Sequence, residues 1–126
     1  MIVRSLADIE STERDVNWGQ GQSRRLLLER DGMGFAVADT QIPAGVDITI
    51  QYRSHLEACY CIEGTGEIQD MDGNAWPLEP GVIYALDQHD THRLLAFTDM
   101  RLVSVFNPPI RGDEKHNLNG DSHSSY

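Results

Sequence analysis

The stretch from Gly45 to His92, GVDITIQYRSHLEACYCIEGTGEIQDMDGNAWPLEPGVIYALDQHDTH, decides the fold of this chain. It holds two segments framed by glycine. One runs from Gly45 to Gly64 and contains Glu57, and the other begins at Gly81 and ends at His92. Carboxylates and imidazoles are both ligands that divalent metals accept. Glu57 and His92 are therefore candidate metal ligands.

The spacing of these segments resembles the general pattern of the cupin superfamily. The residues that match it in type and separation are Gly45, Glu57, Gly64, Gly81 and His92. Cupins are small jelly-roll barrels, so the resemblance implies an all-β barrel with the metal in its interior.

Two usual cupin ligands are absent from the pattern. Gln51 and Arg53 stand where the superfamily has histidines. Asp87 and His89 stand where it usually has proline and glycine. Another side chain must complete the site. Tyr84 is our candidate, and His89 is its rival.

Short β-branched and alternating runs recur at roughly ten-residue intervals, separated by turn-forming Gly, Pro and Asp. Ser5 followed by Asp8 predicts one helical turn at residues 5–10. The polar, glycine-broken residues 15–22 are expected to form a loop with Trp18 exposed. The predicted strands are residues 23–29, 33–40, 46–52, 56–63, 67–69, 76–78, 82–86, 92–96 and 100–106.

These patterns predict a single cupin domain over residues 1–126, an all-β, cupin-type jelly-roll barrel with one or two short helical turns. Its mouth is expected to have room for one small ligand. The polar C-terminal tail, about residues 112–126, lacks periodicity, and we expect it to be mobile unless a ligand or partner orders it.

Composition narrows the classes of function. The formal net charge of -10 disfavours binding to nucleic acid. The first 20 residues are charged and no long apolar run follows, so neither a signal peptide nor a membrane span is expected. Cys59 and Cys61 lie two apart in one predicted strand, where side chains run parallel and do not bridge. We interpret them as reduced thiols of a cytoplasmic protein.

Alternation places one set of side chains on the same face of the central strand as Glu57. The set is Gln51, Arg53, His55, Glu57, Cys59, Cys61 and Glu63. A carboxylate buried in a barrel must be paired or must hold a metal. Together with Tyr84 and His92, Glu57 would form a triad suited to Fe²⁺, Mn²⁺ or Zn²⁺.

Simpler interpretations exist for several residues. A single glutamate on a strand is usually at the surface, and Phe106 is more often core than a platform for a ligand. Arg24 and Arg25 are candidate surface charges, and alternation lets only one of them face inward. The two cysteines are most simply small buried apolar residues.

Longer strings resemble the ectoine synthase family across nearly the whole chain. They are MIVRSLADIESTERDV at the start, SRRLLLERDGMGFAVADT (23–40), HLEACYCIEGTGEI (55–68) and YALDQHDTHRLLAFTDMRLVSVFNPP (84–109). The family's members are cupin dimers, carbon–oxygen hydro-lyases that close N-γ-acetyl-L-2,4-diaminobutyrate into the compatible solute ectoine with loss of water. They are understood to use iron(II), so the resemblance implies Fe²⁺, with Zn²⁺ or Mn²⁺ as alternatives.

The resemblance also implies roles for single residues. Glu57, Tyr84 and His92 match the family's metal ligands. Tyr84, Glu114 and His116 are the candidates for proton transfer. The positions expected to contact substrate are Trp18, Ser23, Arg24, Arg25, Thr40, Tyr52, Ser104 and Phe106. An arginine suits the substrate carboxylate, and an aromatic face suits the cationic product.

Three features depart from the family. Trp18 is five residues before Ser23, whereas the family often has a tryptophan two residues before it. Many members have cysteine where Ser104 stands. The tail after His116 is short and polar. Two other functions remain open. One is another small-molecule metallocupin enzyme, a lyase or dioxygenase, and the other is a cupin that binds a solute without turnover.

Overall fold

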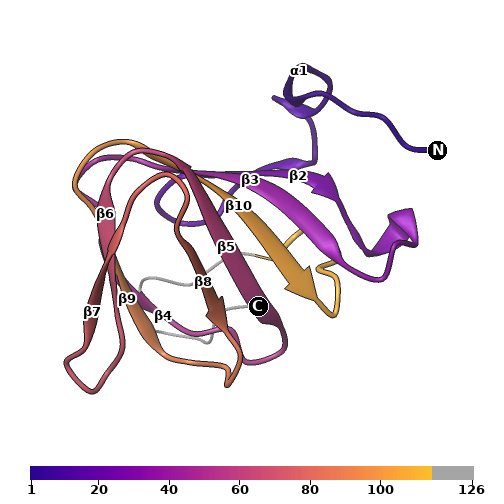
Figure 1. The fold of residues 1–126 in the computed structure, drawn as a ribbon. Coiled ribbons are helices and arrows are strands. Elements are labelled where there is room, and N and C mark those ends of the chain that lie inside the picture. Colours follow the sequence, from indigo (N-terminus) through magenta and orange to yellow (C-terminus); the bar gives the residue numbers. More distant parts are fainter. Residues whose placement is uncertain (115–126) are drawn as a thin grey trace.

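The computed structural model describes residues 1–114, and these form two antiparallel β-sheets with two short helical elements (Figure 1). The predicted all-β fold is confirmed. In chain order the elements are α1 (Leu6–Ile9), β1 (Asp15–Asn17), β2 (Gln22–Leu27), η1 (Glu29–Asp31), β3 (Ala36–Ile42), β4 (Asp47–Ile50), β5 (Leu56–Glu63), β6 (Gly66–Gln69), β7 (Ala75–Leu78), β8 (Ile83–Leu86), β9 (His92–Ala96) and β10 (Met100–Asn107).

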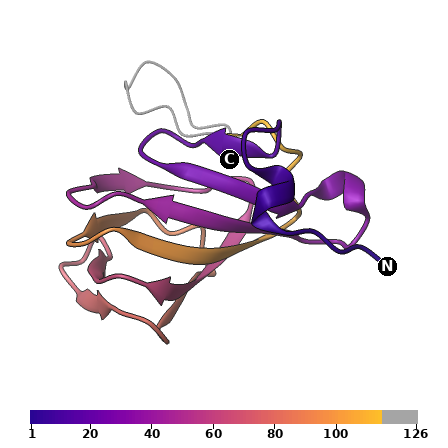
Figure 2. The same cartoon turned by 90° about the horizontal axis from the view of Figure 1, so that it is seen from above.

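The six-stranded sheet has the order β1-β2-β3-β10-β5-β8, and the four-stranded sheet has the order β4-β9-β6-β7. Turning the molecule shows the two sheets as layers, with α1 beside β2 at one side (Figure 2). The core lies between the sheets, where β10 contributes Met100, Leu102 and Phe106 and β9 contributes Leu94. The central strands β5 and β10 pair along almost their full length, so they position the residues of the interior.

Residues 15–22 correct the sequence interpretation. Asp15–Asn17 is strand β1, which pairs with β2 instead of forming a loop. Trp18 is buried, and its indole nitrogen donates to the carbonyl of Gln41 at 3.3 Å. The sequence suggested a loop because glycine interrupts this segment. Gly21 is instead required by packing, since a Cβ at this position would lie 2.1 Å from the carbonyl oxygen of Gln41. The glycine permits close packing of the hairpin on β3.

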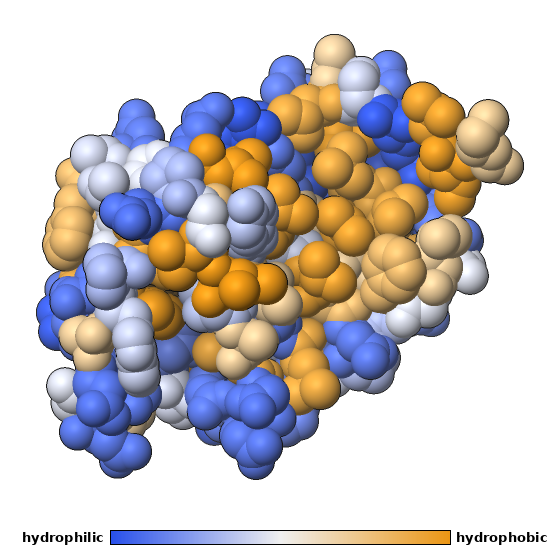
Figure 3. All heavy atoms as spheres, viewed as in Figure 1, coloured by the Kyte–Doolittle hydropathy of each residue, from blue (hydrophilic) through white to orange (hydrophobic). Residues whose placement is uncertain are grey.

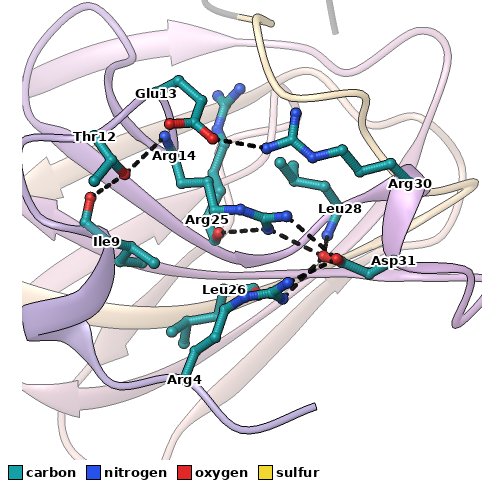
Figure 4. A network of polar contacts seen from close by, with 10 residues as sticks. All are labelled: Arg4, Ile9, Thr12, Glu13, Arg14, Arg25, Leu26, Leu28, Arg30 and Asp31. Atoms are coloured by element: carbon teal, nitrogen blue, oxygen red, sulfur yellow. Dashed lines mark hydrogen bonds and ion pairs between the residues drawn. The ribbon is translucent and has the colours of Figure 1, made fainter. Parts of the chain in front are cut away.

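The N-terminal segment is held to the barrel through Asp31 (Figure 4). Its carboxylate accepts from Arg4 at 2.9 and 3.1 Å and from Arg14 at 3.0 and 3.2 Å. The amide of Leu28 donates to it at 2.9 Å. Burial by itself would raise the pKa of Asp31, but these hydrogen bonds outweigh it and hold the pKa well below its usual range.

Asp31→Asn should lower the free energy of unfolding by about 2 kcal/mol, because two largely buried guanidinium groups would lose their counter-charge. A carboxylate whose pKa is depressed by folding stabilises the fold above its unfolded pKa, and this contribution is lost only as pH falls through the folded value. Thermal unfolding at pH 7 and pH 5 should therefore show the same deficit. Asp47→Asn, which breaks the exposed pair with Arg93, is the control and should have a much smaller effect. Equal effects would contradict the assignment.

Candidate metal centre and substrate cavity

The barrel encloses a small cavity of about 30 Å³ between the two sheets. Its lining side chains are Trp18, Ser23, Thr40, Ile42, Ile50, Tyr52, Glu57, Cys59, Tyr84, Leu94, Leu102, Ser104 and Phe106. Eight of these were predicted as ligand or substrate residues. The volume suffices for about one or two water molecules. The expected room for a small ligand is thus not present in this conformation, and binding requires lining side chains to move.

Strand register explains why these residues meet. Ser23 on β2 lies opposite Thr40 on β3. Further along the same sheet, Cys59 on β5 pairs with Ser104 on β10 and with Tyr84 on β8. Opposed residues of paired strands point to the same face. The inner face of the six-stranded sheet therefore presents a row of small polar side chains that ends at Tyr84.

Glu57 points into this interior and is 5% exposed. Burial raises its pKa to about 7, although hydrogen bonds from Cys59 and Tyr52 oppose the shift. The predicted alternation holds for His55, Cys59 and Cys61, which are buried. It fails at Arg53, which precedes β5, and at Glu63, where the register with β10 shifts; both are exposed.

His92 has the hydrogen-bond pattern of a metal-ligating histidine. Its Nδ1 lies 2.9 Å from the carbonyl oxygen of Asp90, which fixes Nδ1 as the donor. Its Nε2 is buried and has no hydrogen-bond partner among residues 1–114. Burial lowers the pKa of His92, so the imidazole is neutral at pH 7 and Nε2 carries a lone pair. A buried acceptor of this kind fits a metal ligand.

Tyr84 lies beside His92, with ring centroids 6.2 Å apart. Burial and the nearby Cys59 and Glu57 raise the pKa of its phenol far above the usual value, so the side chain is neutral in this structure. Within residues 1–114, His, Cys, Asp and Glu side chains do not form a three-membered metal cluster. This agrees with a triad in which the phenol oxygen of Tyr84 accompanies Glu57 and His92.

Tyr84 and His92 line a second, larger cavity of about 370 Å³ on the side of β7 and β8. Glu57 lines only the first cavity, His92 only the second, and Tyr84 lines both. Its rim includes the exposed Trp76 and Ile83. The proposed ligands thus lie between two cavities.

The rival ligand His89 is exposed, with a positive φ of 52°, and its Nδ1 lies 2.9 Å from the carbonyl oxygen of Tyr52. The side chain of Gln51 donates to the carbonyl of His89 at 3.0 Å. Gln51 and His89 stand at positions where the cupin pattern usually has other residues, and here they stabilise a surface loop. We do not retain His89 as a ligand.

The two arginines are both buried, so the interpretation as surface charges is wrong. Arg25 lies on the side of Ser23, to which its Nε donates at 3.2 Å. Arg24 lies on the opposite face of β2 and forms ion pairs with Asp39 and Glu10. This corrects the predicted contact of Arg24 with substrate, because the sheet separates its side chain from the cavity.

Glu114 is packed and 2% exposed, whereas it was expected in a mobile tail. Its carboxylate accepts from the amides of Arg111 and Gly112, both at 2.8 Å, and lies 3.8 Å from Arg25. Burial would raise its pKa, but the amides and Arg25 lower it. An ionised carboxylate of low pKa is a weak base. Glu114 is therefore better suited to form an ion pair with Arg25 than to accept a proton. His116 lies outside the described residues.

Tyr52 and Phe106 form an aromatic wall beside Glu57. Their ring centroids are 5.5 Å apart in an edge-to-face arrangement, and Tyr52 stacks on His92 at 6.0 Å. Trp18 lines the same cavity despite its shifted spacing. The residue that sequence reasoning missed is Cys59. Its place two residues after Glu57 on the same face was the available signal, whereas its position opposite Ser104 appears only in the structure.

Two antiparallel sheets packed around an apolar core with a partly polar cavity define a cupin-type jelly roll. A cupin domain from Schizosaccharomyces pombe shares this fold, with a TM-score of 0.63 at 14% identity, covering 85% of this chain and 69% of that chain. Residues 1–125 match the family described as ectoine synthase. The chain belongs to the ectoine synthase family.

Two relatives support this placement. L-ectoine synthase from Halalkalibacterium halodurans is 54% identical over 121 residues, which cover 95% of this chain and 94% of the relative. The crystal structure of ectoine synthase from P. lautus has a TM-score of 0.85 at 51% identity, covering 89% of this chain and 81% of that chain. Among residues 1–114, no helix is long and apolar enough to cross a membrane.

Proposed function

We propose that this chain is a metal-dependent ectoine synthase, which closes N-γ-acetyl-L-2,4-diaminobutyrate into ectoine with loss of water. The match to the family across residues 1–125 carries the proposal. Ectoine is a compatible solute, so the enzyme would act in the response to osmotic stress, in the cytoplasm. Fe²⁺ is the proposed metal, with Zn²⁺ or Mn²⁺ as alternatives that the ligand set also accepts.

The reaction joins the α-amine to the carbonyl carbon of the acetamide and expels the carbonyl oxygen as water. The substrate carries both partners, so the barrel contributes by folding the substrate into a reactive shape. A divalent ion held by Glu57, Tyr84 and His92 would supply a Lewis acid at the acetyl oxygen.

Residues of the chain supply the remaining contacts. The hydroxyls of Thr40 and Ser104 lie on the cavity wall and can orient the amide. Arg25 is proposed to bind the substrate carboxylate, which would share the guanidinium with Glu114. The ring of Phe106 offers a face to the cationic product.

Two hydrogens must leave the amine nitrogen and reach the departing oxygen. Tyr84 is the proposed acid, because a dipositive ion at the site would lower the pKa of its phenol, which burial raises in the metal-free chain, so that its proton could pass to that oxygen. The low pKa of Glu114 disfavours it as the base. His116 remains the proposed base.

The proposal is tested by incubating protein loaded with Fe²⁺ with the substrate under anaerobic conditions and following ectoine by NMR. Cyclisation without oxygen supports the synthase. Oxygen uptake that depends on substrate and iron would instead indicate a dioxygenase. Saturable binding without turnover would indicate a solute-binding cupin.

We also propose that the chain forms a homodimer, as the family's members do. The outer face of the six-stranded sheet carries exposed apolar side chains, visible as a broad hydrophobic area in Figure 3. Tyr60 on β5 is 46% exposed and pairs with Ile83 on β8, which is 61% exposed. Val105 and Leu56 extend this surface. An exposed apolar face of this kind is typical of an interface between proteins.

The double variant Tyr60→Lys/Ile83→Lys should weaken the dimer by roughly 30-fold or more, because it would bury unpaired charges in the interface. Light scattering coupled to size-exclusion chromatography measures the mass. Phe97→Lys is the control, since Phe97 is 62% exposed but lies in the turn between β9 and β10. A monomeric wild type, or a dimer unaffected by the double variant, would refute this interface.

A further inference from the structure

Cys59 lies at the centre of the proposed metal site, although the proposed reaction assigns it no step. It is 2% exposed, and its sulfur lies 3.4 Å from the hydroxyl oxygen of Ser104. Its neighbour across the β5–β8 pairing is Tyr84, and Glu57 lies two residues before it on the same strand and lines the same cavity. One side chain therefore lies next to two of the three proposed ligands and contacts one residue proposed to bind substrate.

The chemistry of a neutral thiol fits these contacts. Sulfur accepts weakly and S–H donates weakly, so one thiol can donate to the carboxylate of Glu57 and accept from the phenol of Tyr84. Ser104 in turn lies 3.0 Å from the hydroxyl of Thr40. The row Thr40, Ser104, Cys59 thus connects the cavity wall to the ligands through side-chain contacts on one face of the sheet.

An independent observation indicates that these ligands surround a binding position. The Nε2 of His92 is buried and lacks a hydrogen-bond partner within residues 1–114, and its ring lies beside Tyr84. A buried acceptor without a partner is costly unless something binds it. The neighbours of Cys59 are thus arranged around a position where an ion can be bound.

We propose that Cys59 is a positioning residue of the metal centre. Its thiol orients the carboxylate of Glu57 and the phenol of Tyr84 toward the position in front of His92 and links both to Ser104. The inference rests on the proposed metal-dependent function. Side chains that hydrogen-bond to metal ligands typically contribute 10- to 100-fold to metal affinity.

Cys61 provides a matched control. It is a thiol on the same strand and the same face, two residues further along, and it is 0% exposed. Its sulfur contacts the backbone carbonyls of Glu63 and Gly64 at 3.5 and 3.8 Å, not the proposed ligands. Truncation of either cysteine removes one buried sulfur, but only Cys59→Ala removes one that lines the cavity beside Glu57 and Tyr84.

The experiment titrates metal-free full-length protein with Co²⁺, whose visible absorption reports both affinity and ligand geometry. We expect Cys59→Ala to lose roughly 10- to 100-fold in affinity, with an altered spectrum. Cys59→Ser, which keeps a donor and an acceptor, should recover part of the affinity. Cys61→Ala should bind within about twofold of the wild type. Circular dichroism identifies a misfolded variant, and Cys59→Ser then serves alone in the comparison.

Equal affinities and spectra of Cys59→Ala and Cys61→Ala would overturn the proposal. So would an intense sulfur-to-cobalt charge-transfer band in the wild type that is lost in Cys59→Ala, because Cys59 would then be a direct ligand. The readout does not depend on turnover. A wild type that binds Co²⁺, shows the Cys59 effect and yet forms no ectoine with iron would refute the proposed function alone.

Discussion

Glu57→Gln is expected to abolish metal binding and turnover while making the metal-free protein more stable at pH 8. The first effect follows from the loss of an anionic ligand, and we expect metal affinity to fall at least roughly 100-fold, more than for the loss of a residue that only supports a ligand. The second effect follows from the pKa of Glu57, which burial raises to about 7.

The sign of the stability effect follows from proton binding. Between the ordinary glutamate pKa of 4.5 and the folded value of about 7, the folded metal-free chain holds a proton that the unfolded chain has lost. Stability therefore falls as pH rises through this window and stays lower above it. The accumulated cost is roughly 3 kcal/mol at pH 8. The amide side chain of the Glu57→Gln variant is neutral at every pH and avoids this cost.

Denaturant unfolding of the metal-free proteins from pH 5 to pH 8 tests the second effect, and metal analysis with an NMR assay of turnover tests the first. Glu63→Gln is the control, since Glu63 ends the same strand but its side chain is 60% exposed. A Glu57→Gln protein that kept metal and activity would refute the ligand set. A variant less stable than the wild type at pH 8 would refute the raised pKa.

His92→Ala should likewise remove the metal and reduce turnover to background, whereas His89→Ala should leave both nearly unchanged. The two histidines form a matched pair, because each places Nδ1 2.9 Å from a backbone carbonyl oxygen. They differ at the other nitrogen and in burial: His92 is 2% exposed, and His89 is at the surface. A ligand role depends on the buried Nε2 and predicts a loss of affinity of at least roughly 100-fold for His92→Ala only.

Metal content after loading with Fe²⁺ and removal of excess ion measures this difference, and circular dichroism checks that both variants fold. Loss of metal from His89→Ala with retention in His92→Ala would show that His89 is the ligand and His92 is not. Retention in both variants would place the metal elsewhere in the chain.

Sequence patterns were most reliable where the cause is local. The capping box of Ser5 and Asp8 and the strands flanked by turn residues depend on neighbours in the chain, and both are found. The grouping of Glu57 with Cys59 and Cys61 on one face followed from alternation within β5. These features needed no knowledge of the partner strand.

Residues whose environment depends on distant segments were predicted less well. Trp18 is buried only because the β1–β2 hairpin packs against Gln41. Glu114 becomes an ordered anion through Arg25, which is 89 residues away in the chain. Arg24 is buried by Asp39 on the neighbouring strand. No local pattern reports such contacts, and the role of Cys59 likewise depends on the register between β5, β8 and β10.

Because Tyr84 lies between two cavities, an ion and a substrate could reach it from different sides. The smaller cavity, beside Thr40 and Ser104, is where the amino-acid derivative would bind. The larger cavity meets solvent at Trp76 and reaches Tyr84 and His92 from the other side. An ion held by the proposed ligands would thus be approached from the larger cavity, whereas the amino-acid derivative would bind on the other side of Tyr84.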